Sequence, residues 1–235
     1  LILTHSYYNL AGSLDSVFKK YDLPITKQPN YASAILPAIK SLAKYYSLKD
    51  PGNNFFTELG GYLQQIKTEA SSRFGSDDFW MMIIDNLVAE NIEFQNRNNY
   101  IISGNARDMQ MAKNLRWLYD KKFPNEKIIV WAANGHIAKF GNANEVSNKK
   151  IVRMGSYFTN DSARLKTTYV LGFDSYSGYA GRLGWDTSKI NEPKNDGFEN
   201  WIDKQYEYAF VDFNKFKSSG NYKPQSFFLK GMGHM

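Results

Sequence analysis

The chain has 235 residues, a formal net charge of +6, 43% hydrophobic residues and no cysteine. This composition is ordinary for a globular protein, and the lack of cysteine excludes disulfides and thiolate metal sites while leaving the cellular compartment open. Basic and acidic residues are interspersed, which favours a solvated surface over nucleic-acid binding, and no apolar run approaches the roughly 18 residues that a membrane span needs.

The first hundred residues are predicted to be mainly helical. Apolar residues recur at helical spacing in a short segment that ends before Pro24, over residues 33–48, over 55–74 and over 79–95. The Gly-Ser-Asp-Asp sequence at 75–78 breaks the third segment and can cap the fourth, because Asp accepts hydrogen bonds from the first backbone N–H groups of a helix.

A further helix is predicted over residues 103–118. Met111, Leu115 and Leu118 recur at the spacing of one helical face. Asp108 falls in the expected first turn, where the helix dipole favours a carboxylate. This helix leads through a short loop into the most informative stretch of the chain.

That stretch is an apolar run at 128–133, which stops abruptly at Asn134, Gly135 and His136. A short continuous apolar run that begins with β-branched residues predicts a strand buried on both faces of a parallel sheet. Open parallel sheets bind ligands at the carboxyl ends of their strands. We therefore expect Asn134 and His136 to line the principal cleft.

The overall prediction is an α/β fold with a mostly parallel sheet and a mainly helical amino-terminal part. Segments 167–173 and 208–213 are the other candidate strands beside 128–133. We divide the chain into residues 1–100, the helical part, and 101–235, the α/β part, and the two can together form one domain.

The order of residues in the second part resembles the erythromycin esterase-like proteins. The pattern is Arg-Asp-x-x-Met-Ala-x-Asn-Leu-x-Trp-Leu, a short gap, and a β run that ends Trp-Ala-x-Asn-x-His, and it is followed by Met154-Gly-Ser-Tyr-Phe158 and Tyr169-Val-Leu-Gly-Phe173. The resemblance extends from about Ser103 to Phe213. The matching residues are Arg107, Asp108, Met111, Ala112, Asn114, Leu115, Trp117, Leu118, Trp131, Ala132, Asn134 and His136.

The resemblance implies metal-independent hydrolysis of an ester, such as a macrolide lactone, in which a histidine base activates water. The chain departs from the family pattern in two places. Ala133 stands where the family usually has a second histidine, and the family's amino-terminal Gly-Glu-x-x-His motif, which bears the presumed base, has no match here. We therefore expect the carboxy-terminal part of such a protein or a shortened relative, with little esterase activity of its own.

His136 is the predicted catalytic residue, because a neutral imidazole can accept or donate a proton near pH 7. Arg107, Asp108, Asn134 and Trp131 are the predicted substrate-binding residues. Each has a structural alternative: Arg107 and Asp108 can fasten the helix by a charged pair, Asn134 can satisfy a loop instead of donating to an oxyanion, and Trp131 can belong to the core.

The expected partner is a small-molecule or saccharide ester, without nucleic acid or membrane. No cofactor is expected, and no metal either, because the three histidines lie far apart in sequence with no carboxylate at ligand spacing. The alternative is a non-catalytic protein that binds a polysaccharide or another polar ligand. The histidine missing at Ala133 and the 16 tyrosines favour that alternative.

Overall fold

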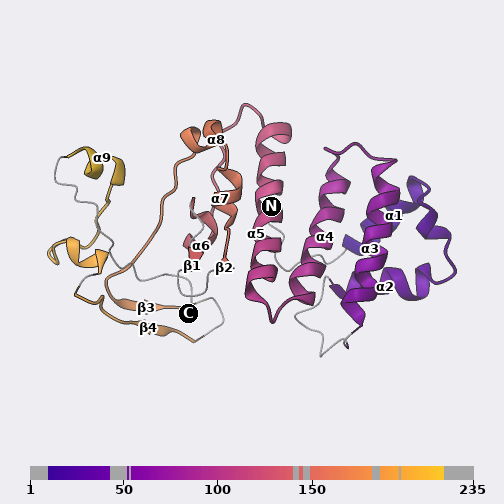
Figure 1. Ribbon diagram of the computed structural model, residues 1–235, viewed down its shortest axis with the longest axis horizontal. Coiled ribbons are helices and arrows are strands. Elements are labelled where there is room, and N and C mark those ends of the chain that lie inside the picture. Colours follow the sequence, from indigo (N-terminus) through magenta and orange to yellow (C-terminus); the bar gives the residue numbers. More distant parts are fainter. Residues whose placement is uncertain are drawn as a thin grey trace. The chain divides into compact units, whose positions relative to one another are not determined.

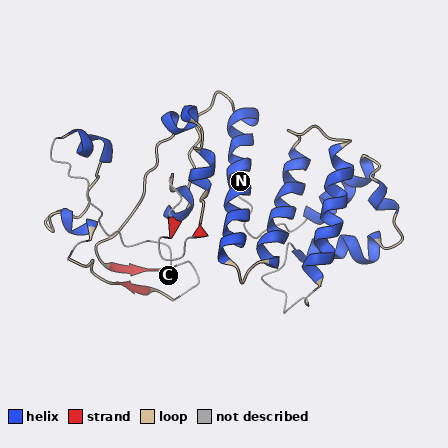
Figure 2. Ribbon diagram, viewed as in Figure 1, coloured by secondary structure: helices blue, strands red, loops and turns tan. Residues whose placement is uncertain are grey.

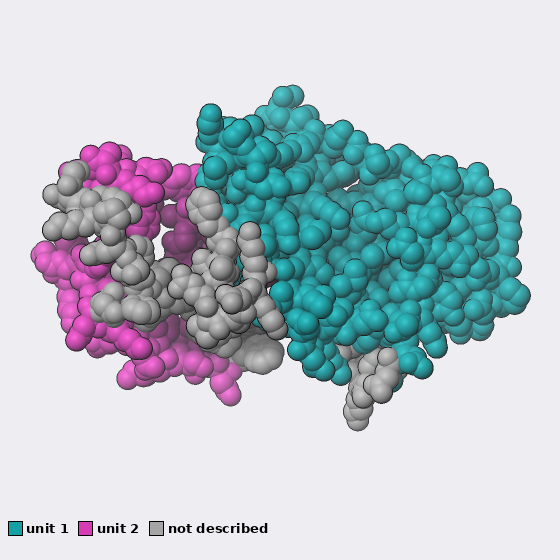
Figure 3. Space-filling model, in the orientation of Figure 1, with its two compact units in different colours: residues 1–130, 138–168 teal, residues 131–137, 169–235 magenta. Residues whose placement is uncertain are grey.

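The computed structural model describes residues 10–42, 52, 54–139, 143–144, 149–181, 186–195 and 197–219 (Figures 1 and 2). The chain forms two compact units (Figure 3). Unit 1 comprises Leu1–Val130 and Ala138–Thr168, and unit 2 comprises Trp131–Ile137 and Tyr169–Met235. The predicted division at residue 100 stays a prediction.

Unit 1 is built from helices that pack side by side. Helix α4 packs against α3 on one side and α5 on the other, and the short α7 packs on α5. A π-helical turn, Tyr31–Ile35, leads into α2, and a second one, Leu118–Lys122, continues α5. The α-helices of this unit are α1 (Leu10–Lys20), α2 (Leu36–Leu42), α3 (Phe55–Ser71), α4 (Phe79–Gln95), α5 (Tyr100–Trp117), α7 (Met154–Phe158) and α8 (Ser162–Thr167).

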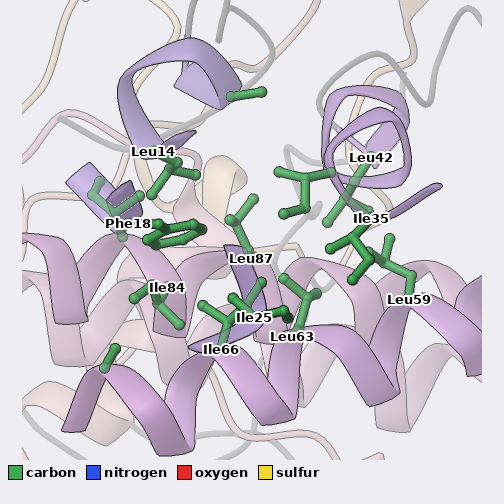
Figure 4. Close-up of a cluster of buried hydrophobic side chains, with 14 of the residues drawn as sticks. Leu14, Phe18, Ile25, Ile35, Leu42, Leu59, Leu63, Ile66, Ile84 and Leu87 are labelled. Atoms are coloured by element: carbon green, nitrogen blue, oxygen red, sulfur yellow. The ribbon is translucent and has the colours of Figure 1, made fainter. Parts of the chain in front are cut away.

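The core of unit 1 lies among α1 to α4 (Figure 4). Leu59, Leu63 and Ile66 recur at the spacing of one face of α3, and this face meets Phe18 from α1 and Leu87 from α4 in one buried cluster. Each such side chain contributes about 1.5–3 kcal/mol when it leaves water. The helical amphipathicity predicted from the sequence therefore builds this core.

The predicted ends of α4 agree with the structure, whereas α3 ends at Ser71, before the predicted end at residue 74. Helix α4 spans Phe79–Gln95 as predicted, and the Asp78 side chain accepts a hydrogen bond from the Trp80 backbone N–H at 2.7 Å. The last residues of the helix predicted over 33–48 lie outside the described residues.

Helix α5 begins at Tyr100, earlier than the predicted start at residue 103. Asn99 is its cap and accepts a hydrogen bond from the Ile102 backbone N–H at 3.3 Å. The predicted first-turn position of Asp108 is therefore wrong, because Asp108 lies well inside the helix.

The predicted parallel sheet is wrong. In the described part of the chain the strands form two antiparallel pairs, and the segments 128–133, 167–173 and 208–213 contain no paired strand. Ile129 is 92% exposed and Trp131 85% exposed, so the apolar run is not buried. The pairs are β1 (Ala143–Asn144) with β2 (Lys149–Lys150) and β3 (Gly178–Ala180) with β4 (Ser188–Ile190).

The physical reason is that a β-branched apolar run favours an extended backbone but cannot make a sheet alone. A strand needs neighbours that accept and donate its backbone hydrogen bonds and elements that cover its faces. Among the described residues, the run at 128–133 has no such neighbour.

Unit 2 contains short elements and many aromatic side chains. Its helical elements are α6 (Asn134–Ile137), a 3₁₀ turn at Phe198–Trp201, and α9 (Phe213–Ser218). The ring of Phe198 lies 5.1 Å from that of Trp201 and 5.4 Å from that of Phe213. These aromatic pairs, together with the β3–β4 hairpin, organise the unit.

Candidate functional site

Asn134 is held by its side-chain amide. Its Nδ2 donates to the backbone carbonyl of Phe173, and its Oδ1 accepts from the Phe173 backbone N–H at 3.1 Å. The ring of Trp131 lies 5.8 Å from the ring of Phe173. One side chain thus satisfies both backbone groups of a residue on the neighbouring segment, as a paired strand would do. This contact ties the end of the run at 128–133 to the segment that ends at Phe173.

His136 lies in the single turn of α6, directly after this contact. It is half-buried, and its backbone N–H donates to the carbonyl of Ala133 at 2.9 Å. The Ile137 backbone N–H donates to the same carbonyl at 3.3 Å. The contact of Asn134 with Phe173 therefore fixes the start of the turn that carries the imidazole. A half-buried imidazole in a fixed turn is suited to proton transfer.

Trp131 does not belong to a core. Its side chain is exposed, and its ring lies 5.8 Å from the ring of Phe173. The core alternative for Trp131 is therefore wrong, because the strand on which it depended is not covered by other elements. The substrate-binding role of Trp131 stays a prediction.

Asp108 lies in unit 1 and is fully buried. Its Oδ1 accepts a hydrogen bond from the Met154 backbone N–H at 2.8 Å, at the first residue of α7. Arg153 Nη1 lies 3.6 Å from Oδ2, and Arg153 Nη2 donates to the Tyr100 hydroxyl at 2.9 Å. Burial and the negative charge of Asp108 together raise the pKa of Tyr157. Asp108 thus fastens α7 to α5 by its charge.

Asn105 makes a second tie at the same place. Its Oδ1 accepts from the Val152 backbone N–H at 2.9 Å. Asn105 lies inside α5, which begins at Tyr100, and its side chain therefore ties this helix to the segment that leads into α7.

Arg107 lies on the other side of α5, toward α4. Its Nη1 is 3.8 Å from Glu93 Oε1, and both side chains are partly exposed. Burial, and secondly the negative charge of Glu93, raises the pKa of Glu90 to about 7. Glu90 was not predicted as a site residue. It could have been identified from its spacing, because a residue three positions after Leu87 lies on the side of α4 that carries the apolar stripe.

Asn114 shows that part of the family pattern holds the helices together. Its Nδ2 donates to Asn86 Oδ1 at 2.7 Å, and its Oδ1 accepts from Asn86 Nδ2 at 3.2 Å and from Gln110 Nε2 at 2.9 Å. A reciprocal amide pair between α4 and α5 sets the register of these helices, because any slip would leave buried amides unpaired.

The predicted site residues therefore fall into two groups. Arg107 and Asp108 belong to unit 1, whereas Trp131, Asn134 and His136 belong to unit 2. Within the second group, Asn134 and Trp131 both contact Phe173, and His136 follows in the same turn. Across the described ranges, no set of three or more acidic or histidine side chains is placed to hold a metal ion, and no helix has the length and apolarity to cross a bilayer.

Comparison with known proteins identifies the family of this chain. The family model for erythromycin esterase matches residues 26–229, so the chain belongs to the erythromycin esterase family, and the predicted resemblance is confirmed. "Putative hydrolase YbfO" of Bacillus subtilis (strain 168) is 35% identical over 82 residues, which cover 31% of this chain and 16% of that protein. No solved structure matches the chain.

Proposed function

We propose that the chain serves in the hydrolysis of an ester or lactone, and that His136 assists the attack of water on the carbonyl carbon. Family membership supports a hydrolase-like function, and the fixed turn at Asn134–His136 supports the choice of residue. In this proposal the base of the family's Gly-Glu-x-x-His motif accepts a proton from water as the carbon–oxygen bond forms and returns it to the leaving alkoxide. The His136 imidazole N–H donates a hydrogen bond to the carbonyl oxygen as that oxygen gains negative charge.

Asn134 acts in this scheme by positioning. Both ends of its amide are engaged by the backbone of Phe173, so the side chain supports the turn that carries His136. A misplacement of about 1 Å can cost a hundredfold in rate, so such support matters for turnover. The oxyanion role first considered for Asn134, and the substrate-binding roles of Arg107 and Asp108, stay predictions.

The test compares ester hydrolysis by the complete gene product with hydrolysis by the 235-residue chain. We expect the chain alone to stay near background with 4-nitrophenyl butyrate, because the Gly-Glu-x-x-His motif has no match in it. In the complete product, His136→Gln should lower kcat/KM by about 10²–10³, the usual contribution of one donor to the developing oxyanion. Lys166→Gln, an exposed change on α8, is the matched control.

Two results would contradict the proposal. One is full activity of the complete product after His136→Gln. The other is no hydrolysis of simple esters or lactones by the complete product, together with saturable binding of a polysaccharide. The second result would favour the non-catalytic alternative, which the exposed Tyr169, Tyr179, Tyr206 and Tyr208 of unit 2 support, because a tyrosine offers both an apolar ring and a polar hydroxyl.

A further inference from the structure

A cleft of about 230 Å³ lies between α4 and α5 in unit 1, at the end where α4 begins and α5 finishes. Its walls come from the residues just before α4, from both helices and from the turn that continues α5. The volume suits a small organic molecule, below the usual range of drug-sized pockets. The charges and the wall of this cleft indicate what kind of molecule that is.

The acidic side chains that line the cleft are already neutralised. Each of the aspartates in the lining is in contact with a basic side chain, so the cleft has little remaining attraction for a cation. The pairs are Asp77 with Lys121 at 2.7 Å, Asp85 with Lys67 at 2.6 Å, and Asp120 with Arg164 at 2.5 Å.

Two basic side chains in the lining are not neutralised in this way. Arg116 Nη2 donates to the backbone carbonyl of Tyr157 and to Asn160 Oδ1 at 2.7 Å, and both of these acceptors are uncharged. Lys113 lies three residues earlier on α5, hence on the same face, and among the described residues neither it nor Arg116 has an acidic partner. The cleft therefore carries a local positive charge.

The rest of the wall includes a fixed aromatic ring. The Trp117 indole Nε1–H donates to the backbone carbonyl of Asp77 at 2.6 Å, and its ring lies 6.2 Å from the ring of Phe79. Met82 adds a thioether to the lining. A pre-oriented indole beside a flexible thioether offers an apolar surface to a flat ligand.

We propose that this cleft binds a small carboxylate with a flat apolar body. The carboxylate meets Lys113 and Arg116, and the body lies against Trp117 and Met82. Because both N–H groups of Arg116 Nη2 are already used, Arg116 offers the carboxylate its Nη1 N–H groups, and Lys113 supplies the second charged contact. This site is independent of the hydrolysis proposed for His136, and its test does not use turnover.

The test follows the indole signals of the ¹⁵N-labelled 235-residue chain in NMR titrations with benzoate, benzamide and benzylammonium at constant ionic strength. Of the 5 tryptophans, Trp117 is assigned by Trp117→Phe. Benzoate should shift its indole signal with saturation at a Kd of about 1–5 mM, the scale for so small a ligand. Benzamide, its uncharged analogue, should bind at least about fivefold more weakly, and benzylammonium should cause no saturable shift.

Variants then locate the charge. Lys113→Gln should weaken benzoate binding about fivefold, which corresponds to the loss of roughly one solvated charge contact. Lys113→Glu should abolish it, and Lys40→Gln, an exposed change on α2, should leave it unchanged. The dispersion of the amide spectrum confirms that each variant is folded. Equal binding of benzamide, saturable binding of benzylammonium, no shift by benzoate up to about 20 mM, or undiminished binding by Lys113→Gln would each overturn the proposal.

Discussion

The helical core of unit 1 and the extended run at 128–133 are both apolar in sequence, yet they differ in burial. Ile66 on α3 is 0% exposed, whereas Ile129 in the run is 92% exposed. A helix satisfies its own backbone hydrogen bonds and needs only another apolar face, but an extended segment depends on neighbours for both. An apolar sequence therefore predicts burial more safely when its period is helical.

The same substitution in both places tests the difference in burial directly. Ile66→Ala should lower the free energy of unfolding by about 2–5 kcal/mol, because it opens a cavity in the core. Ile129→Ala should change it by less than about 0.5 kcal/mol, because that side chain is already in water. Chemical denaturation followed by the helical circular dichroism signal measures both. Equal losses would mean that Ile129 is covered and that the predicted buried strand exists.

Asp108 tests whether a buried charge, as well as apolar contact, holds unit 1 together. Asp108→Ala leaves the Met154 N–H without its acceptor and removes the negative partner of the partly buried Arg153, so we expect a loss of about 2–3 kcal/mol in the same assay. Asp77→Ala, which breaks an exposed pair with Lys121, is the control and should leave the denaturation midpoint unchanged. If Asp108→Ala were as mild as the control, Asp108 would not fasten α7 to α5.

Glu90 adds a pH dependence to the packing of α4. Its folded-state pKa of about 7 lies above its ordinary 4.5, so the folded protein holds this proton more tightly than the unfolded chain. The associated stability is full below about pH 4.5 and is lost as the pH rises through 7. Glu90→Gln should therefore raise the free energy of unfolding at pH 8, relative to the parent chain, by about 1–2 kcal/mol after allowance for partial exposure.

The measurement for Glu90→Gln is denaturation at pH 5 and at pH 8, with the exposed Glu126→Gln as control. The stability gained by Glu90→Gln over the parent should be larger at pH 8 than at pH 5, while Glu126→Gln should show no such difference. A gain that is the same at both pH values would argue against a proton held at Glu90.

The smallest effect is expected at the place where the family has its second histidine. Ala133 is exposed, so an imidazole at this position meets water and leaves no buried polar group unpaired. Ala133→His should leave the melting temperature within about 2 °C, as for other surface changes, and ester turnover of the 235-residue chain at background. A clear gain of turnover in the folded variant would show that the base needed for hydrolysis is already present in this chain.

The sequence predicted the main helices and the family, but it did not predict the amide and carboxylate contacts that connect the elements. The cap at Asp78 and the stripe of Leu59, Leu63 and Ile66 are local patterns, each of which can be seen within a few turns of one helix. The pairing of Asn134 with Phe173 joins segments 39 residues apart, and no local spacing reports it.

The sequence by itself determined where most helices of the first hundred residues lie, which faces they bury, and that His136 belongs to an erythromycin esterase-type pattern. These follow from helical periodicity, capping and residue order, which are properties of short stretches. Only the tertiary structure decided that the run at 128–133 stays unpaired and exposed, that Asp108 is used to fasten α7, and that burial raises the pKa of Glu90. Each of these depends on groups that are distant in sequence: strands that could pair with the run, backbone N–H groups that reach Asp108, and side chains that bury Glu90. A linear pattern does not contain that information.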